Sequence, residues 1–92
     1  MGYHKVALLN TSENAVGEAC AIHRHQRLLF VVHIQGQANC TVQARQLDGD
    51  WKTLETFAAS GELNTDNYGW HEVRATASGM QNAKVNVDVS WR

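Results

Sequence analysis

The sequence predicts an all-β fold, an antiparallel β-sandwich or jelly-roll-like barrel of six to eight short strands. Alternating apolar and polar segments recur at intervals of roughly ten residues, with turn-forming residues between them. The pair Asp48 and Gly49 separates two such segments, which is typical of a β-hairpin because glycine accepts the positive φ that these turns need. The last segment, residues 84–91, alternates most clearly of all.

The first half of the chain supplies three expected strands. Residues 5–9 are expected to form a short first strand, ended by the polar turn formers of residues 10–14. Residues 16–23 alternate loosely around Gly17 and are expected to form a bulged second strand. Residues 27–34 are apolar on both faces, which indicates a strand that is central or covered on both sides.

The hairpin occupies the middle of the chain. Residues 41–46 and 52–57 are its two strands, and Trp51 beside the turn is expected to cap the open end of the sandwich. Residues 58–67 are polar and are expected to form a loop. A helix over residues 61–73 is the alternative, but its two glycines and the lack of a period near 3.6 argue against it.

Two further strands are expected near the end of the chain. Residues 70–77 alternate, residues 79–83 are expected to form a turn, and residues 84–91 form the closing strand. Burying each large apolar side chain stabilises the fold by about 1.5–3 kcal/mol, so the closing strand is expected to be a main contributor to the core. Its inward residues are expected to be Val85, Val87, Val89 and Trp91.

Composition limits the function. The 92 residues form one expected domain, 1–92, with 43% hydrophobic and 18% charged residues, as in a folded globule. A formal charge of −1 gives no overall basic field, so we expect no nucleic-acid partner. The first residues lack the charged-then-apolar pattern of a secretory signal and no run approaches membrane-spanning length, so we expect neither secretion nor membrane association. Cys20 and Cys40 are expected to be buried reduced thiols, although pairing across neighbouring strands stays open.

Catalysis and cofactor binding find little support. Ser, His and Asp residues are scattered without the arrangement that a nucleophilic triad needs, and we expect neither an enzyme nor a cofactor. Asp48, Asp50 and Glu55 lack the spacing of a calcium loop. His23 and His25 can share one face of a strand, but the third and fourth ligands of a zinc site are missing nearby.

Three motifs together carry a resemblance to a known family. They are Asp-Gly-Asp-Trp at residues 48–51, Val-Arg-Ala at residues 73–75, and Val-x-Val-x-Val at residues 85–89. Their order over about residues 27–91 resembles small β-sandwich proteins of tailed-phage structural gene clusters. Two departures stand out: one residue fewer separates glycine from tryptophan, and Trp-His-Glu at residues 70–72 replaces an aromatic-proline pair.

The resemblance implies a non-enzymatic virion protein, most specifically a capsid decoration (cement) protein. Such a protein would be made in the host cytoplasm, sit on the capsid exterior and bridge subunits of the major capsid protein. It would act as a homo-oligomer, a dimer or trimer. For the strand at residues 27–34, whose two faces are apolar, either one face meets a neighbouring subunit or both faces are covered by the two halves of the barrel. The alternatives are a glycan- or receptor-binding module of a tail fibre, and a tail or connector subunit.

The expected partner contacts lie in loops and in the N-terminal segment, where a rigid scaffold usually presents them. A basic cluster at residues 23–27 suits an acidic partner surface, and the alternative is a solvated connection. Trp70 is either a partner contact or part of local packing, and with Tyr68 it would stack on a sugar in a glycan-binding module. The candidate contact residues are Tyr3, His4, His23, Arg24, His25, Asn64, Tyr68 and Trp70.

Overall fold

The computed structural model describes residues 4–22 and 27–91, which form an antiparallel, all-β arrangement of seven strands. Two long strands, β4 (Arg27–Arg45) and β7 (Glu72–Trp91), pair with each other along most of their length. The shorter strands are β1 (His4–Thr11), β2 (Ala15–Val16), β3 (Cys20–Ala21), β5 (Lys52–Phe57) and β6 (Gly61–Asp66). Within the described part of the chain, no helix is long and apolar enough to cross a membrane.

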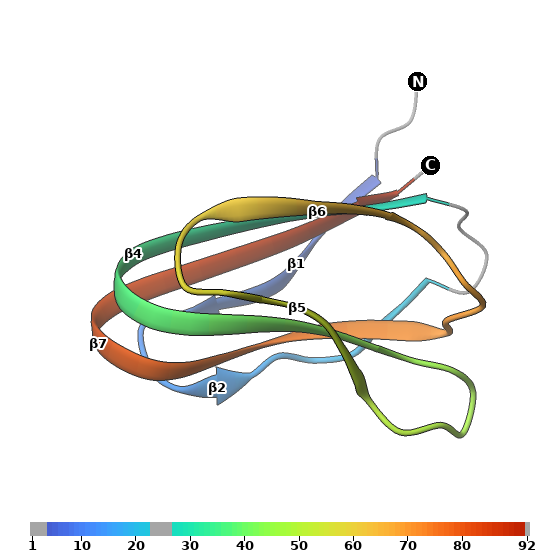
Figure 1. Ribbon diagram of the computed structural model, residues 1–92, viewed down its shortest axis with the longest axis horizontal. Coiled ribbons are helices and arrows are strands. Elements are labelled where there is room, and N and C mark those ends of the chain that lie inside the picture. Colours follow the sequence, from blue (N-terminus) through green and yellow to red (C-terminus); the bar gives the residue numbers. More distant parts are fainter. Residues whose placement is uncertain (1–3, 23–26, 92) are drawn as a thin grey trace.

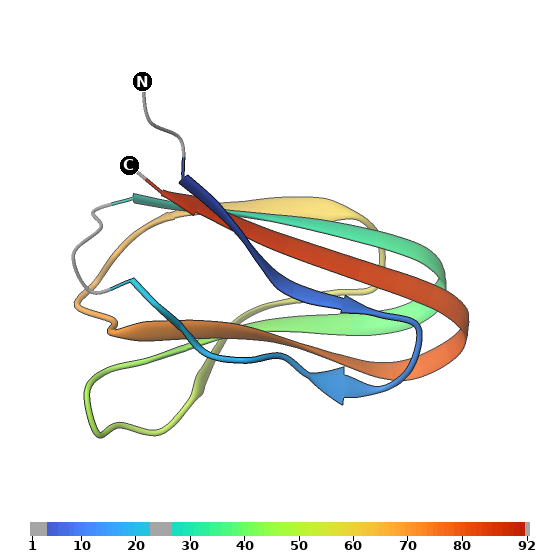
Figure 2. The ribbon, with the colours of Figure 1, turned by 180° about the vertical axis from the view of Figure 1, so that it is seen from behind.

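Both long strands bend, and the bends divide the sheet into two layers (Figures 1 and 2). The β6 layer contains β1, residues 84–91 of β7, residues 27–35 of β4, and β6. The β5 layer contains β2, β3, residues 72–78 of β7, residues 39–45 of β4, and β5. The expected all-β antiparallel fold is therefore confirmed, although two of its strands are long.

The bends of β4 and β7 lie directly against each other. Gly36 has a φ of +79°, and a Cβ there would lie 2.2 Å from the carbonyl oxygen of Asn82. Gly79 and Asn82 also have positive φ, at 61° and 47°. The predicted turn at residues 79–83 is therefore wrong in one respect, because the chain changes direction there while it stays within β7. The matching bend in β4 lets the two strands remain paired on either side.

The core fills the space between the layers. Leu8 and Leu9 are both buried, because a register shift in β1 turns two successive side chains inward. Trp91, expected inside, is half-buried and packs at the edge of the core. The expected alternation in the long strands is otherwise confirmed: their buried residues include Leu28, Phe30, Val32, Val42, Ala44, Val73, Ala75, Val85, Val87 and Val89.

The second strand is not the single bulged strand predicted for residues 16–23. In the described residues it is two separate two-residue strands, β2 and β3, both paired with β7. Gly17 lies between them and donates its N–H to the carbonyl oxygen of Ala75 at 2.8 Å. A Cβ at Gly17 would lie 2.3 Å from the carbonyl oxygen of Leu8, so this close approach to β1 requires glycine.

The loop predicted for residues 58–67 is also wrong, because this segment contains β6. The strand pairs with β4 in unbroken register from Arg27 opposite Asp66 to Val32 opposite Gly61. Ser60 extends this pairing by one position, since its hydroxyl accepts the N–H of Ile34 at 2.8 Å. Polar residues form a strand here because β4 offers them a hydrogen-bonding edge.

The two cysteines are free, as the sequence predicts. Cys20 pairs with Val73 and Cys40 with Ala77, four positions apart along β7. At about 3.3 Å per residue this places them at least about 13 Å apart, beyond the reach of a disulfide. Cys40 is fully buried, and burial raises the pKa of its thiol to about 11. Burial also raises the pKa of the half-buried Cys20.

Candidate functional site at the open end

The open end of the sandwich lies opposite the bends of β4 and β7 (Figure 1). It is formed by the connection at residues 46–51, the connection at residues 67–71, and the ends of the strands that flank them. Ile22, just after β3, lies at this end too, because its N–H donates to the carbonyl oxygen of His71. Arg27 begins β4 opposite Asp66, next to the connection at residues 67–71. Segments far apart in the sequence therefore meet here.

Asn67 holds the connection at residues 67–71 in place. Its side-chain oxygen accepts the N–H groups of Trp70 at 2.7 Å and Gly69 at 3.0 Å. Its side-chain amide donates to the carbonyl oxygen of Ile22 at 3.1 Å. This short polar side chain therefore replaces backbone hydrogen bonds and ties two connections together. Asn67 lies in the loop near residues 64–70 that was expected to make partner contacts, but its structural role was not predicted, although an Asn two positions before a Gly is a recognisable signal for such a turn.

Backbone bonds brace the same connection from two sides. The N–H of His71 donates to the carbonyl oxygen of Arg45, and the N–H of Ile22 donates to the carbonyl oxygen of His71, both at 2.8 Å. Gly69 has a φ of +90°, a backbone conformation that residues with a side chain rarely adopt. The loop is thus fixed to both β3 and β4 and presents its exposed side chains in a defined geometry.

Tyr68 and Trp70 meet edge to face, with ring centroids 5.6 Å apart and planes at 76°. Trp70 is half-buried and packs against the core, which is the local-packing alternative. Tyr68 is 67% exposed and is the side chain that reaches solvent. Leu47, in the neighbouring connection, is 69% exposed. Gln46 lies close to Gly69, so these two exposed apolar side chains belong to adjacent loops.

Trp51 was predicted to cap the open end of the sandwich, but it lies over the outer face of the β5 layer. Its ring contacts two guanidinium groups, that of Arg74 at 4.3 Å and that of Arg45 at 4.8 Å from the ring centre. Both arginines alternate with buried residues of β4 and β7, so they point away from the core. The sequence places Trp51 beside the turn but does not indicate which face it covers.

Hydrogen bonds fix these two arginines. Arg45 bonds Glu72 through both Nε, at 2.7 Å, and Nη2, at 2.6 Å from the same carboxylate oxygen. Arg74 donates from Nε to the side-chain oxygen of Gln43 at 2.8 Å. Each pair joins residues that are directly opposite on β4 and β7. The cluster under Trp51 is therefore an ordered patch at the base of the open end.

The hairpin is confirmed, but its turn differs from the expected one. The N–H of Gly49 donates to the carbonyl oxygen of Gln46 at 2.9 Å, and the positive φ of 58° belongs to Asp48. Gly49 is not among the residues with positive φ. Aspartate tolerates this left-handed conformation better than most residues, so it takes the place in the turn that glycine was expected to take.

The other predicted contact residues are placed differently. Asn64 is exposed on β6, opposite Leu29, and belongs to the β6 layer rather than to the open-end loops. His4 begins β1 with its backbone opposite Trp91. The remaining predicted contacts lie outside the described residues: Tyr3, His23, Arg24 and His25. Among the residues that are described, no three His, Cys, Asp or Glu side chains gather in a way that could hold a metal ion.

Comparison with known proteins shows a shared fold. No protein-family model matches the sequence, and no curated protein matches it. The SPBc2 prophage-derived protein YomS has a solved structure with a TM-score of 0.79 and 8% identity, and the match covers 99% of this chain and 94% of YomS. At this identity the likeness is one of fold.

Two other solved structures share the arrangement more loosely. The Yersinia pseudotuberculosis-derived mitogen gives a TM-score of 0.60 at 11% identity, covering 98% of this chain and 85% of the mitogen. A protein of Bacillus endospore appendages, described as disulfide-linked pili, gives 0.51 at 15% identity, covering 98% and 86%. One sandwich architecture therefore occurs in three proteins that their descriptions place in different settings.

Proposed function

We propose that this chain is a structural protein of a phage virion and, within the virion, a capsid decoration protein that bridges neighbouring major capsid subunits. The observation that carries the proposal is the match to a prophage-derived protein over nearly the whole of both chains. The motif order at residues 48–51, 73–75 and 85–89 points to phage structural proteins independently of that match.

The proposed role is mechanical, and the open end is the proposed contact surface. Leu47 and Tyr68 are exposed there on connections that are held by hydrogen bonds to β3 and β4. Fully burying one such side chain against a capsid subunit contributes about 1.5–3 kcal/mol. Because the braced loop loses little conformational freedom on binding, most of this gain is retained as affinity. No catalytic step is assigned to the chain.

An add-back experiment tests this role. Purified protein is mixed with phage heads that lack it, and the heads are examined by electron cryomicroscopy for added density in symmetric positions. We expect saturable binding that Tyr68→Ala and Leu47→Ser both weaken. Val16→Ser is the matched control, because Val16 is 63% exposed but lies on β2, away from these loops. Heads that never acquire the protein would rule out the decoration role.

A glycan-binding module of a tail fibre is a second candidate because of one observation. Tyr68 presents an exposed ring that is supported edge-on by Trp70, and exposed aromatic rings can stack on sugars. Titration with sugars, followed by tryptophan fluorescence, separates the two roles. Saturable quenching that Tyr68→Ala abolishes would favour the glycan-binding role, and an unchanged signal would leave the decoration role as the better explanation.

A further inference from the structure

The edges of the two layers differ in how they are protected against pairing with another chain. β1 and β5 are each interrupted by a register shift and each carry a lysine, Lys5 and Lys52. β2 and β3 are only two residues long. Bulges, lysines and short length are the usual devices that keep an edge strand from pairing with another molecule.

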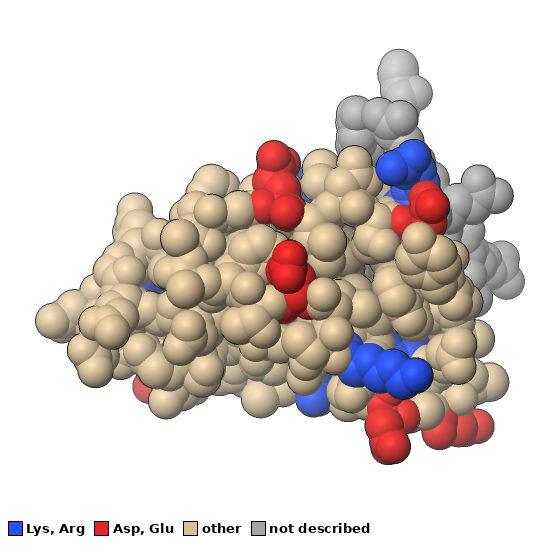
Figure 3. Space-filling model, in the orientation of Figure 1, with Lys and Arg blue, Asp and Glu red and all other residues tan. Residues whose placement is uncertain are grey.

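Among the edge strands that the structure describes, β6 has the fewest of these devices, although it carries two charged residues, Glu62 and Asp66. It pairs with β4 in unbroken register, contains neither lysine nor proline, and has no other described strand beside it. Figure 3 shows the face that carries β5 and β6, on which charged side chains are sparse and most of the surface is uncharged. β6 is therefore a regular edge that, among the described strands, is paired on one side only.

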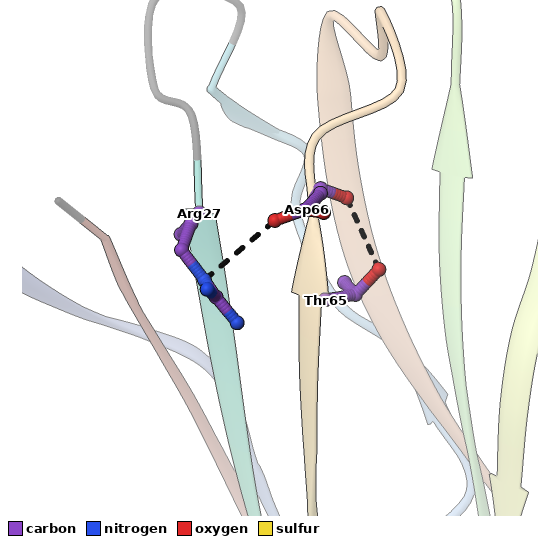
Figure 4. Close-up of polar contacts among 3 residues, drawn as sticks. All are labelled: Arg27, Thr65 and Asp66. Atoms are coloured by element: carbon purple, nitrogen blue, oxygen red, sulfur yellow. Dashed lines mark hydrogen bonds and ion pairs between the residues drawn. The ribbon is translucent and has the colours of Figure 1, made fainter.

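Both ends of β6 are held in place. At one end Arg27 reaches across from β4 to Asp66, with 3.6 Å between Nε and the carboxylate oxygen (Figure 4). The hydroxyl of Thr65 donates to the carbonyl oxygen of Asp66 at 3.0 Å. At the other end Ser60 bonds Ile34. An edge that is ordered in advance loses little entropy when a second strand pairs with it.

We propose that two copies of this chain pair antiparallel through the free edges of β6 and form a symmetric dimer. A two-fold axis at β6 pairs this strand with the same strand of the second copy. Two-fold symmetry is the commonest arrangement in homodimers. The β6 layer would then continue into a sheet with four strands from each copy. This proposal does not rest on the proposed function, because it concerns the chain in solution.

The side chains of β6 restrict the register of such a pair. Gly61, Leu63 and Thr65 are half-buried, whereas Glu62, Asn64 and Asp66 are exposed. Directly opposite residues lie on the same face of an antiparallel sheet. A continuous layer therefore pairs exposed residues only with exposed ones, which places the two-fold axis through a residue of β6.

Charge and the length of overlap then select among the four central positions for the axis, residues 62–65. An axis through Asn64 places Glu62 opposite Asp66 of the second copy, twice, and an axis through Glu62 places that residue opposite itself. An axis through Leu63 places Glu62 opposite Asn64 of the second copy. Directly opposed carboxylates are destabilising across strands, and this register avoids them. An axis through Thr65 avoids them too, but it pairs only residues 64–66 of each copy, whereas the axis through Leu63 pairs residues 61–65. β6 is therefore self-complementary over most of its length in one register, which is why a second copy is the proposed partner.

Charged substitutions at Asn64 test both the dimer and its register. The Asn64 side chain is exposed, so substitution leaves the core unchanged. Asn64→Glu would oppose two carboxylates to Glu62 by symmetry and weaken the dimer about 2- to 30-fold. Asn64→Lys would create two attractive pairs and strengthen it. The matched controls are Asn10→Glu and Asn10→Lys, which change an exposed asparagine on β1 and should alter nothing.

Sedimentation velocity of the intact chain is the measurement, at chain concentrations from about 10 µM to 1 mM because small interfaces are weak. A wild-type protein that stays monomeric over this range overturns the proposal. It is also overturned if neither Asn64 variant changes the association, because β6 is then not the interface. If both variants weaken association equally, the proposed register is wrong, because that result requires Asn64 to face Asn64.

A covalent trap gives an independent readout. In a Cys20→Ala background, the double variant Glu62→Cys/Asn64→Cys should form a disulfide-linked dimer on mild oxidation, because each new thiol faces its counterpart across the axis. Asn64→Cys alone should cross-link far less, since its opposite residue is then Glu62. Cross-linking by the single variant at the rate of the double variant would contradict the register.

Discussion

The close contact of Gly17 with the backbone of β1 makes Gly17→Ala a test of whether only glycine fits between β1 and β7 at this position. A Cβ at residue 17 would lie 2.3 Å from the carbonyl oxygen of Leu8 and 3.1 Å from that of Ala75. Both obstacles are backbone atoms, so no side-chain rotation relieves them. Residue 17 is also held in place, because its N–H donates to the carbonyl oxygen of Ala75 at 2.8 Å.

The expected cost follows from these distances. Relief of the closer contact needs a shift of about 1 Å between β1 and the segment at residue 17, which is an overpacking strain of about 1–3 kcal/mol. For a domain of this size each 1 kcal/mol lowers Tm by about 4–8 °C, so we expect a fall of about 4–24 °C. Urea denaturation followed by far-UV circular dichroism measures the same loss as a free energy of unfolding.

Gly49→Ala is the matched control. Its closest neighbour would be the carbonyl oxygen of Gln46 at 3.3 Å, a contact that a surface turn relieves with a small movement. Gly49 also lacks a positive φ, so alanine should change stability by no more than about 0.5 kcal/mol. If Gly17→Ala unfolds at the same urea concentration as Gly49→Ala, the proposed steric role of Gly17 is wrong.

Three further predictions concern the turn, its tryptophan and the buried thiol. Trp51→Ala should lower the free energy of unfolding by about 1–3 kcal/mol, because it removes two cation–π contacts and the packing of the ring. Trp51→Phe should lower it less. Equal effects of the two substitutions in urea denaturation would contradict this. Asp48→Val should lower stability by about 1–2 kcal/mol and Asp48→Gly should not, because φ at this position is 58°; the same assay measures both. The Cys40 thiol should resist a thiol reagent until the protein unfolds. The free energy of unfolding should fall as pH rises from 9 towards 11, because the thiol ionises at a lower pH in the unfolded chain than in the folded one. Cys40→Ala should show a smaller fall over this pH range.

The sequence predicted strands best where burial alternates. Val85, Val87 and Val89 face the core as expected, because one buried face imposes a period of two on the residues. β6 was missed because Gly61, Asn64 and similar residues have low strand propensity, and their conformation depends on the edge of β4. A tertiary contact of this kind leaves little signal within the segment itself.

The bends of the long strands were missed for a related reason. Gly79 is typical of a turn, and only its pairing partners show that the chain continues as one strand through the bend. Part of the candidate site could be predicted: Tyr68 is exposed at the open end and Trp70 supports it. The face covered by Trp51 could not, because the arginines beneath it come from β4 and β7, which only the fold brings together.

The bends of β4 and β7 also affect how the protein withstands force. Each strand is one continuous backbone that runs through both layers, so the layers are joined by covalent bonds as well as by the packing of their inner faces. A shearing load on one layer is carried along β4 and β7 into the other, and the layers cannot slide apart unless the interstrand bonds at the bends also break. A sandwich joined in this way is expected to unfold under load in a single step that disrupts both layers.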